Sequence, residues 1–412
     1  MNAEIITIGG ELLSGLVVDT NSAFLGKELA KIGVQVDFRT SIADVKEHMA
    51  FALEQALSRA KVVIITGGLG PTHDDITKKT LVEFFDTELV QDEKALEMVK
   101  DRFLRFGYKK MPESNFEQAL VPKSAKVIYN GAGTAQGSHF TENGVDIFSV
   151  PGVPREMRWM FDNYIRDFLD SKTENVIAYR TLKTAGVGES LLWEILGDSN
   201  ELFPNLEVAS LPHAFGVDVR FKAKTKTQDE ANALLDQAEK IILEKVGKNV
   251  FAKDEESLPQ TIVRICKEQN LKIALAESCT GGLIAKLLTD FSGSSEIFWG
   301  GVNSYSNESK VKFLGVKPET LEELGAVSEE VVTQMAKGIL EISEADYGIA
   351  VTGISGPTGG TEEKPVGTTW ISVASRNGIK VKKFNFLFDR DDNRIRAANN
   401  ALEMLRREIT GI

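Results

Sequence analysis

The chain has 412 residues, a length that corresponds to roughly two to four domains, and its 42% hydrophobic content is enough to fill buried cores. A formal net charge of -12 and a pI near 5.1 argue against nonspecific binding to nucleic acid or to an anionic membrane. Two cysteines, Cys266 and Cys279, exclude a disulfide framework and fit a reducing compartment. Since no leader pattern and no apolar run of membrane-spanning length occurs, we expect a cytoplasmic protein without membrane or direct nucleic-acid contacts.

Strand and helix patterns alternate from residue 5 to about residue 169, which predicts a three-layer α/β/α domain. Ligands of such open sheets bind in the loops that follow the strands. The expected strands are 5–8, 34–38, 62–66 and 145–150, and the expected helices include 22–32 and 46–60.

The loop after the third strand is the strongest candidate site of this domain. Its three glycines let backbone N–H groups approach a phosphate, and Thr77 lies near the start of the next helix. Asp74 and Asp75 beside these donors indicate a divalent metal, because two carboxylates would otherwise repel the same anion; helix capping is the alternative. The predicted nucleotide- and phosphate-binding residues are Glu11, Asp19, Asn21, Thr66, Gly67, Gly68, Asp74 and Thr77, and the predicted metal ligands are Asp74 and Asp75.

The middle of the chain lacks the regular alternation of strand and helix patterns. Short β patterns at 179–184, 207–211 and 217–224, followed by a helix pattern at 228–246, predict a small α+β module. A charged segment then precedes a helix that begins near Leu258. The predicted domains are 1–170, 171–253 and 254–412.

In the last domain, an apolar run at 272–275 reads as a buried strand, and the pattern at 283–288 reads as a helix. Ser278 would therefore lie at a strand-to-helix turn, where free helix N–H groups stabilise an oxyanion or a phosphate. A simple helix cap is the alternative. The neighbouring small residues favour a site, because they leave the turn open to a ligand.

All four histidines precede Ser278, so a Ser/His/Asp arrangement within this domain is excluded. The polar segment 300–310 offers Lys310 as a base and Tyr305 as a proton relay or orienting group. Burial would have to lower the pKa of Lys310 from its usual value of about 10.4 toward neutrality, whereas an ordinary solvated lysine is the alternative. Cys279 is a rival nucleophile, but without a His partner it is better explained as a small filler residue.

Two further segments of this domain are suited to anions. A glycine-rich loop at 352–361 follows a strand pattern at 347–351, although a surface loop would look the same. Arg390 and Arg394 begin the terminal helix and would hold a phosphate, or else pair with nearby aspartates on the helix surface. The predicted substrate-binding residues are Thr280, Gly281, Asn307, Thr352, Gly353, Ser355, Gly356, Arg390 and Arg394.

These motifs, in this order, make the chain resemble the CinA (competence/damage-inducible protein A) family over its whole length. Residues 67–77 resemble the phosphate loop of the family's molybdopterin-binding-like N-terminal domain. The segments 276–282, 305–310 and 352–357, with 364–368, resemble its α/β C-terminal domain. The middle module resembles a small KH-like fold, and without a GXXG loop we assign it no RNA role. The first loop departs from the family, because Gly10 stands where Asp or Thr usually precedes Glu-Leu-Leu.

The resemblance implies that the C-terminal domain is a nicotinamide-nucleotide amidase of pyridine-nucleotide salvage, which converts nicotinamide mononucleotide to nicotinate mononucleotide and ammonia. Ser278 would be its nucleophile, assisted by Lys310 and Tyr305, with no cofactor required. The N-terminal domain would be an ADP-ribose pyrophosphatase that uses a divalent metal (Mg, Mn or Co), and the protein a homodimer. Two alternatives remain: a nucleotide-binding or scaffold module without chemistry, and molybdopterin handling by analogy of fold.

Overall fold

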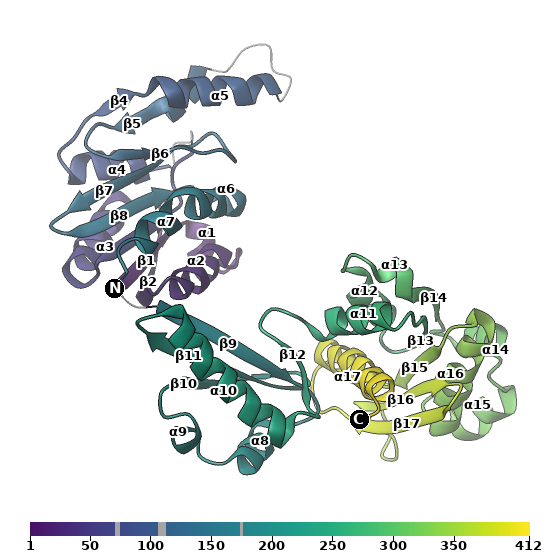
Figure 1. The fold of residues 1–412 in the computed structure, drawn as a ribbon. Helices are drawn as coiled ribbons and strands as arrows, with labels where there is room; N and C mark the ends of the chain where they lie inside the picture. The colour runs from purple at the N-terminus through teal and green to yellow at the C-terminus, as the bar shows by residue number, and fades with distance from the viewer. Residues whose placement is uncertain (71–74, 106–112, 174–175) are drawn as a thin grey trace. The chain divides into compact units, whose positions relative to one another are not determined.

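The structure, a computed structural model, describes residues 1–70, 75–105, 113–173 and 176–412, and Figure 1 shows its elements. Contacts divide the chain into two units, one formed by Met1–Ala178 and Ala223–Asn232 and the other by Tyr179–Lys222 and Ala233–Ile412. None of the described helices combines the length and the apolar character that crossing a membrane requires.

A six-stranded sheet forms the centre of the N-terminal domain, with the strand order β2-β1-β3-β8-β7-β6. The first four of these strands are parallel, and β7 and β6 are antiparallel. Since β1 lies between β2 and β3, the strand order reverses at β1, which is where open α/β sheets bind ligands. The strands are β1 (Asn2–Ile8), β2 (Gln35–Ile42), β3 (Val62–Thr66), β6 (Lys126–Ile128), β7 (Gly137–Glu142) and β8 (Val145–Val150).

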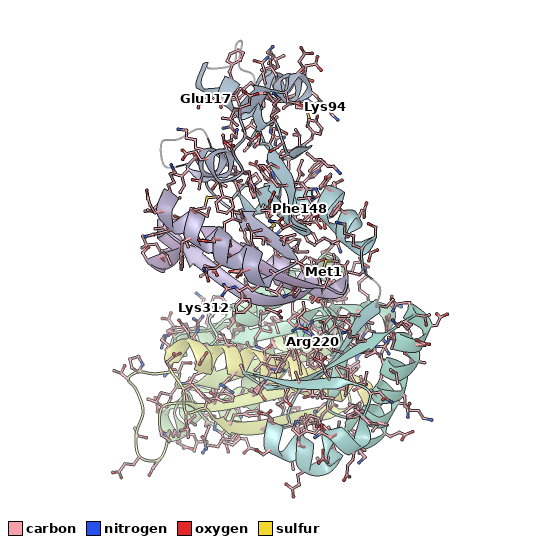
Figure 2. All side chains as sticks on the ribbon, turned by 90° about the vertical axis from the view of Figure 1, so that its left-hand side faces the viewer. Met1, Lys94, Glu117, Phe148, Arg220 and Lys312 are labelled. Atoms are coloured by element: carbon pink, nitrogen blue, oxygen red, sulfur yellow. The ribbon has the colours of Figure 1, made fainter. Side chains whose placement is uncertain are left out.

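Helices cover both faces of this sheet, because its central strands are apolar on both sides. Helix α2 (Thr20–Lys31) packs on the face where Ile5 and Phe148 are buried, and α3 (Lys46–Arg59) packs on the opposite face, over Ile6. Figure 2 labels Phe148 among the side chains that fill this domain. The expected three-layer arrangement is confirmed.

The other elements of this domain surround the sheet. Strands β4 and β5 form a separate antiparallel pair. The elements are α1 (Gly10–Leu13), α4 (Thr77–Phe84), β4 (Leu89–Gln91), α5 (Glu93–Arg105), the 3-10 helix η1 (Glu113–Ala119), β5 (Leu120–Pro122), α6 (Pro154–Met160), the π-helical turn η2 (Phe161–Ile165) and α7 (Arg166–Asp170).

The middle module is α+β, as expected, with a four-stranded sheet in the order β10-β11-β9-β12. Three of its residues, Ala185, Phe251 and Ala252, belong to a buried cluster that continues into the C-terminal domain. The elements are β9 (Val176–Thr184), α8 (Glu189–Leu196), α9 (Ser199–Leu202), β10 (Glu207–His213), β11 (Gly216–Thr225), α10 (Gln228–Val246) and β12 (Val250–Lys253).

The C-terminal domain is also a layered α/β structure, built on a five-stranded sheet in the order β14-β13-β15-β16-β17. Its first three strands are parallel and its last two antiparallel. The strands are β13 (Ile273–Glu277), β14 (Phe298–Asn303), β15 (Tyr347–Gly353), β16 (Thr368–Ser375) and β17 (Gly378–Asn385). The helices are α11 (Leu258–Glu268), α12 (Leu283–Thr289), α13 (Ser294–Ile297), α14 (Asn307–Leu314), α15 (Pro318–Leu324), α16 (Glu329–Ser343) and α17 (Arg390–Thr410).

Both faces of this second sheet are covered. Leu275 and Val351 are buried under α11, α12 and α17, while Ala274 and Ala276 are buried under α16. Strand β13 lies between β14 and β15, so the strand order reverses there and the ends of three parallel strands meet. The residues that follow β13, β14 and β15 are therefore brought to one edge of the sheet.

Candidate active site

Ser278 directly follows β13 and precedes α12, as the sequence predicts. Its backbone N–H donates to the Val351 carbonyl oxygen of β15 at 3.0 Å, which fixes the start of the turn on the neighbouring strand. Gly281 and Gly282 have φ angles of 61° and 92°, in the left-handed region that glycine enters without steric cost. The sequence thus places a serine at the switch point of the sheet on a turn that only small residues can form.

Lys310, on α14, meets Ser278 although 32 residues separate them. Its Nζ donates to Ser278 Oγ at 3.0 Å, and the two residues are 1% and 8% exposed. Burial lowers the pKa of Lys310 to about 8, with a smaller opposing effect of the Cys279 thiol. The structure therefore brings the predicted nucleophile and base together, in surroundings that make the Lys310 amine easier to deprotonate than that of a solvated lysine.

Two backbone carbonyls complete the surroundings of Lys310. Its Nζ lies 2.6 Å from the Ser304 oxygen and 3.5 Å from the Tyr305 oxygen, and both atoms can only accept hydrogen bonds. A neutral amine has two N–H donors and one lone pair. If the donors are given to the carbonyls, the lone pair is left for the Ser278 hydroxyl, which is the arrangement a general base requires.

Tyr305 follows β14 and is exposed to solvent, with 63% of the residue accessible. Its hydroxyl accepts a hydrogen bond from Arg390 Nη2 at 3.1 Å, and Arg390 Nη1 donates to the Gly356 oxygen at 2.6 Å. Within the part of the chain that the structure describes, no hydrogen bond joins the Tyr305 hydroxyl to Ser278 or Lys310. The contacts place Tyr305 as a partner of Arg390 rather than in a proton relay to the dyad.

Arg394 holds the other side of the Ser278 turn, because its Nη2 donates to the Thr280 carbonyl oxygen at 2.8 Å. The N–H of Gly281 donates to the Ser278 carbonyl at 3.1 Å and is thus engaged within the turn. The N–H of Thr280 has no acceptor among the described residues, and neither has its buried hydroxyl. Of the predicted substrate-binding residues Thr280 and Gly281, Thr280 is therefore the one whose N–H is left to donate to an oxyanion.

Sequence reasoning missed Glu277, whose carboxylate lies at the start of α12. It accepts hydrogen bonds from the N–H groups of Gly282 at 3.0 Å, Ile284 at 3.1 Å and Ala285 at 2.9 Å. The expectation that these N–H groups face a substrate anion is wrong, since the protein's own carboxylate takes them. An acidic residue between a buried strand and the serine was the available signal.

The glycine-rich loop after β15 contributes mainly through its backbone and through packing. Thr352 Oγ1 donates to the Ala326 oxygen at 2.8 Å, away from the dyad, and a Cβ on Gly353 would lie 3.1 Å from Cys279 Sγ. Burial raises the pKa of the Cys279 thiol to about 11, although a hydrogen bond with Ser355 opposes this. Cys279 is buried, as a packing residue would be, and its role as a small filler residue stays a prediction. Asn307 begins α14 with its side chain exposed.

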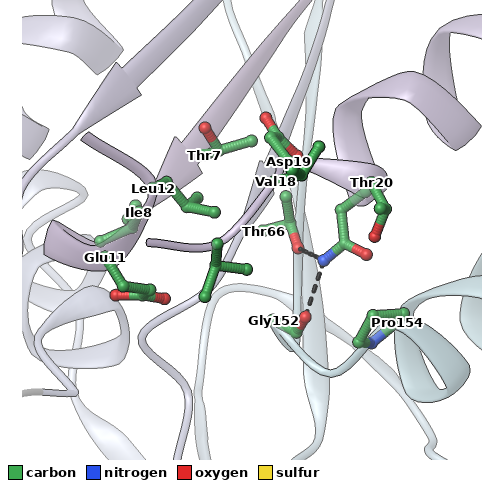
Figure 3. A pocket seen from close by; sticks show the side chains of 12 residues that line it. Thr7, Ile8, Glu11, Leu12, Val18, Asp19, Thr20, Thr66, Gly152 and Pro154 are labelled. Atoms are coloured by element: carbon green, nitrogen blue, oxygen red, sulfur yellow. Dashed lines mark hydrogen bonds between the residues drawn. The ribbon is translucent and has the colours of Figure 1, made fainter. Parts of the chain in front are cut away.

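The N-terminal domain contains a pocket of about 120 Å³ at the ends of β1 and β3, shown in Figure 3. Glu11 and Asp19 line it together with apolar side chains, and none of its described lining residues is Lys, Arg or His. Asp19 also caps α2, since its Oδ1 accepts from the Ser22 N–H at 2.9 Å. The pocket therefore presents carboxylates and no basic group.

Asn21 lies at the centre of this pocket's hydrogen bonds. Its Nδ2 donates to Thr66 Oγ1 at 3.1 Å and to the Gly152 oxygen at 2.7 Å, the two dashed bonds in Figure 3. Its Oδ1 is buried without a partner among the described residues. Together with the Glu11 and Asp19 carboxylates, this oxygen is of the kind that Mg²⁺ and similar hard cations prefer, so the residue types in the pocket suit a divalent metal.

The predicted phosphate loop is described only in part, because Asp74 lies outside the described residues. Thr77 ties the loop to its helix: its Oγ1 donates to the Gly67 oxygen at 2.8 Å and its N–H to the Gly68 oxygen at 3.1 Å. The described ranges contain no cluster of three or more His, Cys, Asp or Glu that could hold a metal. The Asp74 and Asp75 metal site stays a prediction.

Comparison with known proteins gives the family. Three family models match in chain order: "Probable molybdopterin binding domain" at residues 4–171, "Damage-inducible protein CinA KH domain" at 179–252 and "CinA C-terminal domain" at 255–409. A competence-damage inducible protein of Clostridium perfringens SM101 is 40% identical over 415 residues, covering 100% of both chains. The chain belongs to the CinA family.

Two further proteins with similar names match all or part of the chain. A competence-damage inducible protein of Clostridioides difficile 630 is 41% identical over 414 residues, covering 98% of this chain and 99% of its own. Among solved structures, the competence/damage inducible protein CihA of Agrobacterium tumefaciens is 41% identical, covering 37% of this chain and 93% of its own, with a TM-score of 0.36.

Proposed function

We propose that the C-terminal domain is an amidase that converts nicotinamide mononucleotide to nicotinate mononucleotide and ammonia. The observation that supports this most is the buried contact of 3.0 Å between Lys310 Nζ and Ser278 Oγ. A lysine with a lowered pKa can take the proton of a neighbouring serine hydroxyl. The serine is then an activated nucleophile that needs no histidine. We infer the substrate from the family resemblance. We infer the nucleophilic mechanism from the contact between Ser278 and Lys310.

In the first half of the reaction, neutral Lys310 takes the Ser278 proton as Oγ attacks the carboxamide carbon. The carbonyl oxygen becomes an oxyanion and receives the Thr280 N–H. Protonated Lys310, held by the Ser304 and Tyr305 carbonyls, then gives its proton to the departing nitrogen. Ammonia leaves, and an ester between Ser278 and the nicotinate group remains.

In the second half, water attacks the ester carbon while Lys310 accepts a proton from it. The bond between that carbon and Ser278 Oγ breaks, Lys310 returns the proton to Oγ, and the carboxylic acid is released. The dyad is thus regenerated. Arg390, at the start of α17, lies beside exposed Tyr305 and would bind the substrate's phosphate through its guanidinium.

The test is ammonia and nicotinate mononucleotide production by the full chain. Ser278→Ala should abolish it, whereas Ser295→Ala, which changes an exposed serine of α13, should leave the rate unchanged. A wild-type chain that is folded and binds nucleotide tightly but releases no ammonia would instead establish a binding module without chemistry. A Ser278→Ala chain with the full rate would remove Ser278 from the mechanism.

A second function is favoured by the N-terminal pocket. We propose that this domain hydrolyses ADP-ribose with the help of a divalent metal, because Glu11 and Asp19 would repel a diphosphate unless a cation lay between them. When bound, such a cation would polarise the diphosphate. Release of AMP and ribose 5-phosphate, tried with Mg²⁺, Mn²⁺ and Co²⁺, tests this. Copurification of a pterin would favour the molybdopterin alternative.

The remaining expectations concern assembly and place. We propose that the chain forms a homodimer and works in the cytoplasm. Light scattering coupled to size exclusion tests the first point, and cell fractionation tests the second. A monomer at assay concentration would contradict the dimer.

A further inference from the structure

Glu277 is a buried carboxylate with an uncommon set of partners. It is 3% exposed, and its two oxygens accept three backbone N–H groups, from Gly282, Ile284 and Ala285. Among the described residues it forms no ion pair with Lys, Arg or His. Its charge is therefore balanced by backbone donors and by the positive end of α12.

The position of Glu277 in the chain gives this contact a consequence for Ser278. Glu277 is the last residue of β13, so its side chain spans the turn 278–282 and joins the strand to the first turn of α12. The helix has Gly282 at its N-cap and no side-chain cap of its own. The Glu277 carboxylate thus caps α12 from the other side of the turn. No side chain of residues 278–282 is needed as a cap.

The backbone of Glu277 reaches toward the other half of the dyad. Its carbonyl oxygen accepts from the Ser304 N–H at 2.8 Å, and the Ser304 carbonyl accepts from Lys310 Nζ at 2.6 Å. One residue therefore connects the turn that carries the nucleophile with the segment that holds the base.

We propose that Glu277 is a positioning residue for the amidase reaction, whose carboxylate holds the Ser278 turn so that Oγ meets Lys310 Nζ. This inference rests on the proposed function of the dyad. The turn contains two glycines, and its other contacts are the backbone bonds from Ser278 to Val351, from Gly281 to Ser278 and from Leu283 to Thr280, with the Arg394 bond to Thr280. Without the Glu277 carboxylate, its bonds to Gly282 in the turn and to Ile284 and Ala285 in α12 are lost. A displacement of about 1 Å at a nucleophile costs on the order of 10²-fold in rate.

The experiment compares the full chain with Glu277→Gln and with Glu330→Gln, a matched control. Glu330 is an exposed carboxylate in the first turn of α16, which Ser328 caps. Glutamine has the shape of glutamate, but it places an NH₂ donor against backbone N–H donors. We expect Glu277→Gln to lower kcat for nicotinamide mononucleotide about 10²-fold with little change in KM. Glu330→Gln should behave as wild type.

A second readout follows the nucleophile without the substrate. A fluorophosphonate labels an activated serine: a bond forms between Ser278 Oγ and phosphorus, the phosphorus–fluorine bond breaks, fluoride leaves and Lys310 takes the proton. The labelling rate should fall in parallel with kcat, while the thermal unfolding midpoint shows that the variant is folded. Since labelling does not depend on the natural substrate, it still tests Glu277 if the wild-type chain releases no ammonia, an outcome that rejects only the proposed function.

Several outcomes would overturn the proposal. These are wild-type kcat and labelling in folded Glu277→Gln, or a raised KM with unchanged kcat, which would mean contact with the substrate. If Glu277→Gln does not fold, Glu277→Asp decides, because it keeps the charge but is one methylene too short to span the turn. A folded Glu277→Asp with reduced kcat supports the proposal, and full kcat overturns it. Failure of both variants to fold would make Glu277 a folding residue, and that also overturns it.

Discussion

The N-terminal pocket and the Ser278 site occupy equivalent places in two similar sheets. Strand β1 lies between β2 and β3, and β13 lies between β14 and β15, so each site follows a central strand at which the strand order reverses. Their chemistry differs. The first is lined by Glu11 and Asp19 without a basic residue among its described lining, and the second contains Lys310 with Arg390 nearby.

This difference shows how little the sheet alone decides about function. In the proposed function, the C-terminal site supplies its own base, Lys310, and its own cation, Arg390, for an anionic substrate. The N-terminal pocket presents carboxylates to any phosphate that enters, and the proposed reaction there therefore uses a cation from solution. The same sheet topology thus carries one site with acidic side chains and one with basic side chains. Each proposed activity can be tested separately.

The largest expected separation comes from chelation. EDTA should abolish ADP-ribose hydrolysis by the full chain and leave ammonia release from nicotinamide mononucleotide unchanged, because of the two proposed reactions only the one in the N-terminal pocket uses a cation. Both products are measured in one sample, and readdition of Mg²⁺ or Mn²⁺ should restore the first activity. Loss of ammonia release on chelation would contradict the contrast between the sites.

Lys310→Met should lower the amidase rate by about 10³-fold or more, because general base catalysis is lost while Ser278 remains. Methionine fills the buried space without a proton acceptor. Lys312→Met is the matched control, since Lys312 is exposed on the same helix and is labelled in Figure 2. ADP-ribose hydrolysis should be unaffected in both variants. An active Lys310→Met chain would transfer the role of base to another group.

Arg390→Met should raise KM for nicotinamide mononucleotide by roughly 10-fold to 100-fold, the loss expected for a charged hydrogen bond to phosphate. Nicotinamide riboside, which lacks the phosphate, should be hydrolysed equally by the variant and the wild type. Arg376→Met, which changes an exposed arginine at the turn between β16 and β17, is the control. An equal loss with both substrates would show that Arg390 acts through Tyr305 or Gly356 instead.

The sequence predicts the buried parts of the fold well. Strands β3 and β8 and helix α10 have the expected bounds, because their apolar patterns are uninterrupted. The edge strand β2 was expected to end at residue 38 and continues to Ile42, since its polar side chains on a solvent edge give no burial signal. Strand β14 was not identified as a strand, because Gly300 and Gly301 weaken the pattern that its pairing with β13 overrides.

Some residues of the candidate site could be predicted from the sequence and others could not. Ser278 and Lys310 are predictable, because Ser278 follows a clear strand pattern and the missing histidines leave few bases in this domain. The contact of Arg390 with Tyr305 spans 85 residues and depends on how α17 begins, which no local pattern encodes. Glu277 was not identified from the sequence, because a capping residue is expected directly before the helix. Glu277 instead caps α12 from the other side of a turn.

The smallest predicted effect is a difference in pH dependence between the two activities. Burial lowers the pKa of Lys310 to about 8, and the reaction needs its neutral form, so kcat/KM of the amidase should rise about tenfold per pH unit below pH 8 and level off above it. ADP-ribose hydrolysis should lack this limb, because no lysine is among the described lining residues of its pocket. Measuring both profiles on one preparation removes differences in folding. If kcat/KM levels off well below pH 7, an effect besides burial lowers the pKa of Lys310. If kcat/KM still rises near pH 10, Lys310 is solvated in solution, which contradicts a preformed Ser–Lys dyad.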